Sequence, residues 1–151
     1  MTNNENSVKM VDVADKKVVS RSAEAMGEII LQRDTIVKIR KGTSKKGNVL
    51  VVSKTAGIMA AKRTAEIIPL CHQIPLSSVE VSFNFSEDRI QATCRVKALY
   101  VTGVEMESLV GVTSALLSIW DMVKYLEKDE DGQYPIARLE NIRVTMKRKG
   151  E

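Results

Sequence analysis

The chain has 151 residues, of which 44% are hydrophobic and 28% are charged. This length and composition suit one folded domain and exclude a disordered or low-complexity segment. Lys and Arg together number 23 against 19 for Asp and Glu, a mild excess that favours an anionic ligand but is too small for a dedicated duplex-DNA binder. Aromatic residues make up only 4%, which argues against a protein that stacks nucleic-acid bases on aromatic side chains.

Signals for export or membrane insertion are lacking. No apolar run approaches the roughly 20 residues that cross a bilayer, and the polar residues 1–9 hold no signal-peptide core. We therefore expect a cytoplasmic protein that contacts no membrane, in which Cys71 and Cys94 are reduced thiols rather than a disulfide. Residues 1–9 are expected to form a flexible N-terminal arm and residues 10–151 a single domain.

The first half of the chain predicts two strands and two helices. Residues 10–13 form a short apolar stretch that indicates a small edge strand, and the β-branched residues at both ends of segment 17–31 favour a second strand. Residues 34–40 suit a short helix. After a loop rich in Gly and Lys, Asn48 is a good N-cap for a long, partly Ala-rich helix that continues until Pro69 ends it.

A clean alternation of apolar and polar residues is the strongest pattern in the chain. The apolar positions of two adjoining stretches are Val79, Val81, Phe83 and Phe85, then Ile90, Ala92, Cys94, Val96 and Ala98. Such alternation predicts an antiparallel hairpin with one buried face.

The second half of the chain completes the expected fold. A long helix over about 103–127 is followed by an acidic loop at 128–132 and a last strand from 136 to about 147. The order β-α-β-β-α-β, with a small helix inserted after the first strand, is that of the split βαβ arrangement. We therefore expect an α+β, ferredoxin-like fold, with an antiparallel sheet that carries helices on one face.

The long helix carries two stripes of side chains. One contains Met106, Leu109, Thr113, Leu116, Trp120 and Val123; the other contains Val110, Ser114, Leu117, Asp121 and Lys124. A helix that is apolar on more than one side is buried on more than one side. Because one sheet covers only one stripe, the second predicts a subunit contact, with its ionic end in or beside that contact.

Two cationic patches could bind phosphate. Lys46 precedes a helix start, where free N–H groups favour anions, although a solvated lysine loop is the simpler interpretation. Lys62 and Arg63 follow two alanines, so that a ligand could approach closely. The simpler interpretation here is an exposed pair near a helix C-terminus, where cations are favoured in any case.

The segment Leu70-Cys71-His72 holds the only histidine of the chain. Histidine titrates near neutral pH and can move protons or bind phosphate, although a lone histidine is more often structural. A zinc site with Cys94 is disfavoured, because adjacent ligands are a poor spacing match and a fourth ligand is missing. We therefore expect no metal.

Carboxylates mark both ends of the long helix. Glu105 and Glu107 stand in its first turn, where acidic residues usually compensate the helix dipole. Asp121 and Lys124 lie three positions apart and share a face. A surface ion pair would be worth little, but the apolar neighbours of Asp121 predict dry surroundings, in which both groups could act as acid and base.

Three stretches of the chain together carry a resemblance. AGIMAAKRT, IPLCH and TGVEME, in this order, resemble the cyclic pyranopterin monophosphate synthase family, also called molybdenum cofactor biosynthesis protein C. The similarity extends from about Lys9 to Lys147.

The resemblance implies a lyase that acts early in molybdenum cofactor (molybdopterin) biosynthesis. Proteins of the family convert a cyclised dihydro-GTP, made from GTP by a radical enzyme, to cyclic pyranopterin monophosphate and release diphosphate. The family fold is ferredoxin-like, the assembly is a hexamer built as a trimer of dimers, and no metal or organic cofactor is required. Residues 10–151 would then be a catalytic domain.

The resemblance also assigns roles to residues. It implies a catalytic aspartate at Asp121 with its lysine partner at Lys124. Substrate contacts fall on Leu70, Cys71, His72, Met106, Glu107 and the neighbouring Glu105, and cations near the nucleotide fall on Lys46, Lys62, Arg63 and Lys147.

The departures from the family pattern are modest. Val101 stands where many members have Lys, Asn48 replaces a common Asp, and Trp120 replaces a common Tyr. Many bacterial members also carry a Gly-rich, Lys-containing tail, whereas this chain stops soon after Lys147 and Lys149. The difference in the tail bears on how a lid would close over the site, not on the class of reaction.

Two other functions fit parts of the pattern. An RNA-binding module would share the fold, but the polar positions of the predicted hairpin hold no aromatic ring. A regulatory subunit that binds a nucleotide through Lys46 and Lys62 would leave Asp121 without a role.

Helix geometry adds a prediction about assembly. Glu107 and Asp121 are fourteen positions apart, which is about 21 Å along a helix at ~1.5 Å per residue, on nearly the same face. A reacting ring cannot touch both ends, yet the resemblance implies that both contact the substrate. We therefore expect a site at a dimer interface, where Asp121 and Lys124 of one chain meet Met106, Glu107 and His72 of another.

Overall fold

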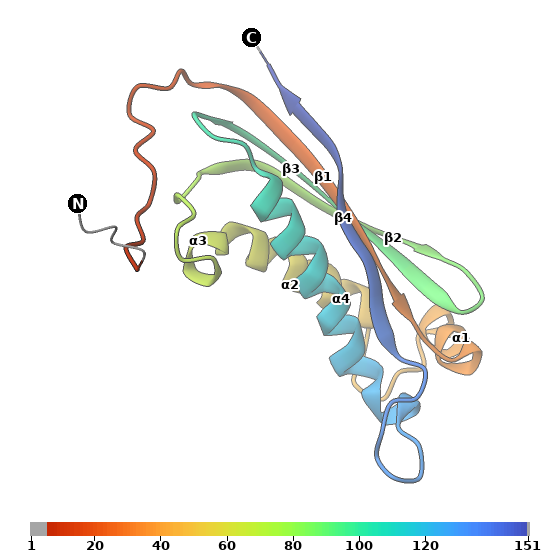
Figure 1. Ribbon diagram of the computed structural model, residues 1–151. Helices are drawn as coiled ribbons and strands as arrows, with labels where there is room; N and C mark the ends of the chain where they lie inside the picture. The colour runs from red at the N-terminus through yellow and green to blue at the C-terminus, as the bar shows by residue number, and fades with distance from the viewer. Residues whose placement is uncertain (1–5, 151) are drawn as a thin grey trace.

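A computed structural model describes residues 6–150 and has four strands and four helices (Figure 1). The strands are β1 (Val19–Ile30), β2 (Leu76–Phe85), β3 (Arg89–Tyr100) and β4 (Arg138–Lys149). The helices are α1 (Arg33–Lys41), α2 (Val49–Lys62), α3 (Thr64–Ile67) and α4 (Glu105–Glu127). The strands form one sheet in the order β2-β3-β1-β4, and each neighbouring pair is antiparallel. The expected α+β, ferredoxin-like fold is confirmed.

The predicted hairpin is confirmed in its residues and its buried face. Val81 pairs with Cys94 and Phe83 with Ala92, and the apolar positions of β3 are buried while Arg95 and Lys97 on the other face are exposed. The long helices α2 and α4 lie on one face of the sheet, and α1 lies at the sheet's end (Figure 1). The core forms between the sheet and α4.

The edge strand expected near the N-terminus is not formed. Residues 10–13 form a loop rather than a strand. The Asp12 carboxylate accepts a hydrogen bond from the backbone N–H of Ala14 at 2.8 Å, and the N–H of Lys16 donates to the carbonyl of Val13 at 3.1 Å. These local bonds turn the chain and replace ladder bonds. Part of the expected arm, residues 1–5, lies outside the described residues, as does residue 151.

The expected single helix up to Pro69 is in fact two helices. Asn48 caps α2 as predicted, with its side chain accepting from the N–H of Val51 at 3.1 Å, but α2 ends at Lys62 and the short α3 follows. The hydroxyl of Thr64 donates to the carbonyl of Ala61 at 2.9 Å. This side-chain bond competes with the helical pattern, and Arg63 leaves helical geometry with φ −113° and ψ 20°.

The long helix is confirmed, but its core-facing side differs from the expected stripes. The residues turned to the core include Val112, Ala115, Leu116, Ile119, Met122 and Val123, of which Leu116 and Val123 belong to the first expected stripe. Because α4 packs against both the sheet and α2, its buried arc is broader than one stripe. Leu117 in the second stripe is 53% exposed, so the predicted subunit contact remains a prediction.

Small residues allow α2 to lie close against α4. A Cβ added at Gly57 would lie 2.9 Å from the carbonyl oxygen of Gly111 and 3.2 Å from the side chain of Ala115. A Cβ at Gly111 would lie 3.3 Å from Ala61 and 2.6 Å from the sulfur of Cys94 on β3. The contacts pair later residues of α2 with earlier residues of α4, so the two helices run antiparallel.

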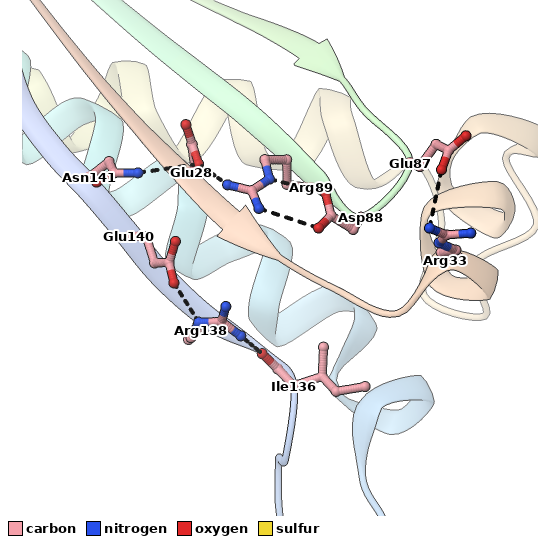
Figure 2. Close-up of polar contacts among 9 residues, drawn as sticks. All are labelled: Glu28, Arg33, Glu87, Asp88, Arg89, Ile136, Arg138, Glu140 and Asn141. Carbon is pink, nitrogen blue, oxygen red and sulfur yellow. Dashed lines mark hydrogen bonds and ion pairs between the residues drawn. The ribbon is translucent and has the colours of Figure 1, made fainter.

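At the end of the sheet near α1, ion pairs join strands and turns (Figure 2). Arg89 lies 2.7 Å from Glu28 and 3.0 Å from Asp88. Asn141 has a positive φ of 56° at an irregularity of the β1–β4 register, and its amide donates to Glu28 at 3.5 Å. This end of the sheet holds none of the predicted site residues.

By length and composition, α4 is apolar enough to cross a membrane. Its packing against the sheet and α2 makes it the central helix of the core, and such helices pass the same test.

Candidate active site

The predicted site residues fall into two groups at opposite ends of α4. The antiparallel packing brings the end of α2 and the loop after α3 to the start of α4, and the loop before α2 to its other end (Figure 1). We call the first group the Glu107 end; it comprises Lys62, Arg63, Leu70, Cys71, His72, Glu105, Met106, Glu107 and Lys147. We call the second the Asp121 end; it comprises Lys46, Asp121 and Lys124.

Glu107 is the buried carboxylate of this site. Its side chain is only 3% exposed, and its Oε1 has no hydrogen-bond partner among the described residues. Burial raises the pKa of Glu107, and the charge of Glu105 adds to the rise. Cys71 lies nearby: burial, followed by the charge of Glu107, raises the pKa of its thiol. The Glu107 end therefore favours the neutral, proton-carrying forms of both groups.

Glu105 differs from Glu107 because it has a cation of its own. The amino group of Lys147, on β4, lies 2.6 Å from Oε1 of Glu105. Burial alone would raise the pKa of Glu105, but the hydrogen bond and charge of Lys147 and the charge of Arg21 lower it below its usual value. Two carboxylates two positions apart thus have pKa values shifted in opposite directions.

The loop before β2 brings His72 to the N-terminal segment. Nε2 of His72 lies 2.6 Å from the backbone carbonyl of Val11. A carbonyl only accepts hydrogen bonds, so Nε2 carries a proton in this contact. No pattern in the sequence indicates this contact, because Val11 holds the histidine through its backbone and not its side chain.

The remaining residues of the Glu107 end lie at the surface. Leu70 and Met106 are exposed apolar side chains, and Arg63 is the exposed residue on which α2 ends. Lys62 lines a cavity of about 410 Å³ together with Gln73 and the start of β2.

At the Asp121 end, two lysines surround one carboxylate. Nζ of Lys124 lies 3.1 Å from Oδ1 of Asp121. Nζ of Lys46 lies 3.9 Å from Oδ2 and donates to the main-chain carbonyl of Asp121 at 2.8 Å. The hydrogen bond from Lys124 and the charge of Lys46 lower the pKa of Asp121, so this carboxylate is ionised at neutral pH.

The expectation of dry surroundings for Asp121 is wrong for the single chain. Its side chain is 65% exposed, because Ile119, Met122 and Val123 turn to the core and Asp121 projects from the opposite side. A helical residue does not share the environment of its sequence neighbours, since adjacent positions are rotated by about 100°.

Asp121 and Lys124 line a cavity of about 420 Å³ with aromatic walls. Trp120 and Tyr134 meet edge to face in it, with ring centroids 5.3 Å apart. Tyr134 was not predicted as a site residue, because it follows the acidic loop and no periodicity links a loop residue to a helix residue fourteen positions earlier.

A second tyrosine holds the loop that carries Lys46. The backbone N–H of Lys45 donates to the hydroxyl of Tyr125 at 2.7 Å, and the amino group of Lys45 lies 5.4 Å from the centre of the Tyr125 ring. These contacts fix the loop against the last turns of α4 and place Lys46 beside Asp121.

The two ends cannot serve one reacting ring within a single chain. Because α4 is one continuous helix, Glu107 and Asp121 stand about 21 Å apart along it. Among the described residues, no group of three or more His, Cys, Asp or Glu side chains is arranged to hold a metal ion, and Cys94 is buried in the core.

Comparison with known proteins places this geometry in a family. A family model with the description "MoaC family" matches residues 10–150. The chain belongs to the MoaC family. A relative from Thermococcus kodakarensis is 58% identical over 147 residues, or 97% of this chain and 94% of the relative, and is named probable cyclic pyranopterin monophosphate synthase.

MoaC relatives with the same name occur in other archaea. The protein from Saccharolobus solfataricus is 52% identical over 141 residues, or 93% of this chain and 95% of its own length. The protein from Methanosarcina mazei is 50% identical over 143 residues, or 95% of this chain and 91% of its own length. The similarity thus spans both ends of α4.

Proposed function

We propose that this MoaC protein is a cyclic pyranopterin monophosphate synthase, in which residues 10–151 form the catalytic domain. It converts a cyclised dihydro-GTP to cyclic pyranopterin monophosphate and releases diphosphate, an early step of molybdenum cofactor biosynthesis. The observation that carries this proposal is the family match over residues 10–150, which includes every predicted site residue. The name shared by the archaeal relatives supports it.

The charges of the site support a triphosphate substrate. Lys46, Lys62, Arg63, Lys124 and Lys147 are distributed over the two ends of α4. Loss of diphosphate develops negative charge on the leaving group, and fixed cations stabilise that charge. No residue needs a metal for this role, and any magnesium would arrive with the triphosphate.

The two carboxylates support the proton transfers of the reaction. Opening a purine ring and closing a pterin ring require groups that accept protons and groups that donate them. The ionised Asp121, held by Lys124, is suited to accept a proton. Glu107, whose pKa burial raises, is suited to donate one. Two titratable groups with pKa values shifted apart are typical of acid and base pairs.

The assembly follows from the separation of the two ends. We propose that Asp121 and Lys124 of one chain meet Met106, Glu107 and His72 of a second chain in a two-fold dimer, so that each dimer has two sites. The exposed Leu117 on α4 lies between the two ends and would contribute to the contact. Three such dimers would make the hexamer, located in the cytoplasm.

A direct assay tests the activity. The purified protein is incubated with the cyclised dihydro-GTP, and diphosphate and pterin fluorescence are measured. We expect both products in equal amounts, and no products from GTP itself, because the family acts on the cyclised intermediate. A protein that is folded and oligomeric but releases no diphosphate would contradict the proposed function.

A further inference from the structure

The loop between α1 and α2 carries Lys46, and local bonds fix its two ends. Gly42, with a φ of 68°, ends α1, and the side chain of Asn48 caps α2. Between these ends, the N–H of Gly47 donates to the carbonyl of Ser44 at 3.2 Å and closes a turn. These bonds shape the loop but do not attach its middle to the rest of the protein.

Tyr125 attaches the middle of this loop to α4. The backbone N–H of Lys45 donates to the Tyr125 hydroxyl at 2.7 Å, and the amino group of Lys45 lies 5.4 Å from the centre of the ring, within the range of a cation–π contact. Tyr125 follows Asp121 by four positions on α4, so the two side chains share one face of the helix. The tyrosine that holds the loop therefore stands one turn from the carboxylate that Lys46 reaches.

The Tyr125 hydroxyl serves the loop as a hydrogen-bond acceptor. The bond from the backbone of Lys45 lowers the pKa of Tyr125 despite the opposing effect of burial, and a hydrogen bond with Ser44 and the charge of Lys38 add to this lowering. The oxygen thus lies among donors and positive charges of the loop and of α1. Phenylalanine in its place would keep the ring but would leave the N–H of Lys45 without this acceptor.

Lys46 depends on the loop for its position. Its Nζ donates to the main-chain carbonyl of Asp121 at 2.8 Å and lies 3.9 Å from Oδ2, but both side chains are exposed in part, and ion pairs of this kind contribute little free energy. A long lysine side chain also loses conformational entropy when it is held in one place. The backbone of Lys46 must therefore be fixed for its amino group to stay beside Asp121, and the N–H that Tyr125 binds belongs to the preceding residue.

We propose that Tyr125 is a positioning residue for the reaction: its hydroxyl fixes the backbone next to Lys46 and so keeps the amino group of Lys46 beside Asp121. The tyrosine acts through Lys46 and does not itself touch the reacting atoms. The use of this arrangement in catalysis rests on the proposed function. The control that Tyr125 has over the position of Lys46 does not, because it follows from contacts within the chain.

A double-mutant cycle on the purified protein tests this coupling. Carbon-13 NMR measures the pKa of the Asp121 carboxyl in the wild type, in Tyr125→Phe, in Lys46→Gln and in the double variant, and Asp121→Asn identifies the resonance. A hydrogen bond from Lys124 and the charge of Lys46 lower this pKa. We therefore expect Tyr125→Phe to raise the pKa of Asp121, because the charge of Lys46 moves away, and to raise it no further in the Lys46→Gln background.

Hydrogen exchange gives a second measurement that needs no titration. The amide proton of Lys45 should exchange about fivefold faster in Tyr125→Phe than in the wild type, because one hydrogen bond of ordinary strength is lost. Tyr100→Phe, which removes a hydroxyl from β3, is the matched control. In this variant, both the pKa of Asp121 and the exchange rate at Lys45 should equal those of the wild type.

An unchanged pKa of Asp121 in Tyr125→Phe would overturn the positioning role. A rise of the same size in the Lys46→Gln background would overturn it as well, since Tyr125 would then act on Asp121 by another route. The expected shift in a protein that does not convert the cyclised substrate would support the positioning role and refute the proposed function. In an active enzyme, Tyr125→Phe should lower kcat more than it raises KM, and an unchanged kcat would contradict the use of this arrangement in catalysis.

Discussion

The two ends of α4 hold carboxylates in opposite conditions. Glu107 is 3% exposed, has one oxygen without a partner and a pKa raised by burial. Asp121 is 65% exposed, lies 3.1 Å from Lys124 and has a lowered pKa. One end is organised to keep a proton and the other to keep a negative charge, although both lie on the same helix.

This difference supports our proposal that the site needs two chains. Acid and base functions that serve one substrate must lie within reach of the same atoms, yet here a rigid helix keeps them about 21 Å apart. A second copy of the chain, turned by a two-fold axis, would bring the Asp121 end of one α4 to the Glu107 end of another. Such an axis makes the same contact twice.

The largest expected effect comes from the Asp121 end. Asp121→Ala should lower the rate on the cyclised substrate by about 10³-fold or more, in the upper range for loss of a general base, and Lys124→Ala should do nearly the same. Because Asp121 is exposed and packs no core, thermal unfolding of Asp121→Ala should match that of the wild type.

A matched control is Asp131→Ala, which removes an exposed carboxylate from the acidic loop and should leave the rate unchanged. Wild-type rates for both Asp121→Ala and Lys124→Ala would show that the catalytic residues lie elsewhere.

The second test joins the two ends. Asp121→Ala and Glu107→Ala chains should each be inactive as homodimers, since each lacks one end of every site. After equal mixing and subunit exchange, half of the dimers are hybrids with one intact site of two, so about one quarter of wild-type activity should return. Native mass spectrometry would verify the exchange. Verified hybrids without activity would refute the shared site.

Much of the fold that positions the two ends of α4 could be predicted from the sequence, because it depends on local patterns. The alternation in β2 and β3, the Asn48 cap and the length of α4 are properties of neighbouring residues, and each is confirmed. The contacts that hold the site are not local. Tyr125 meets Lys45 eighty positions away, and Val11 meets His72 sixty-one positions away; no periodicity announces such pairs.

The core-facing side of α4 could be predicted only in part, for a related reason. The helix is apolar over a broad arc, so its sequence alone does not say which of its residues pack against the sheet and which pack against α2. The position of α2 depends on Gly57 and Gly111, which allow a close approach that hydrophobic patterns do not reveal.

The third test concerns the stability of the Glu107 end. A carboxylate with a pKa raised by folding contributes stability below its ordinary pKa of ~4.3, and this contribution is lost as the pH rises through the folded-state pKa. Glu107→Gln replaces the carboxyl group by an amide that does not ionise, so the variant does not lose this stability as the pH rises. At pH 7 the variant should have a higher Tm than the wild type, because the neutral amide avoids the burial of a charge, while its activity falls.

The pH dependence distinguishes this effect from a general gain in packing. The difference in Tm between Glu107→Gln and the wild type should shrink as the pH falls to 4, because Glu107 is then mostly neutral in the unfolded chain as well as in the folded chain. A gain of the same size at pH 4 and pH 7 would contradict the raised pKa.

The fourth test uses the two thiols as reporters. Burial raises the pKa of Cys94 to about 12, whereas Cys71 is half-buried, with a pKa raised by burial and by Glu107. A thiol reagent at pH 8 should therefore label Cys71 slowly and Cys94 only on unfolding. In Glu107→Gln, Cys71 should react faster.

Elemental analysis should find no stoichiometric zinc, and tightly bound zinc would contradict the prediction that the site has no metal.

The smallest expected effect is a change of tautomer at His72. Because this is the only histidine of the chain, the nitrogen resonances of a ¹⁵N-histidine-labelled protein need no assignment. The bond to the Val11 carbonyl predicts a proton on Nε2, so that the neutral form of the ring would be the Nε2 tautomer, with Nδ1 free to accept a proton from substrate. Deletion of residues 2–12 removes that carbonyl, and the tautomers should then mix, whereas deletion of residues 2–6 should leave the spectrum unchanged. A ring protonated at Nδ1 in the full chain would show that Val11 does not hold this histidine, and that the Glu107 end presents its other nitrogen to the substrate.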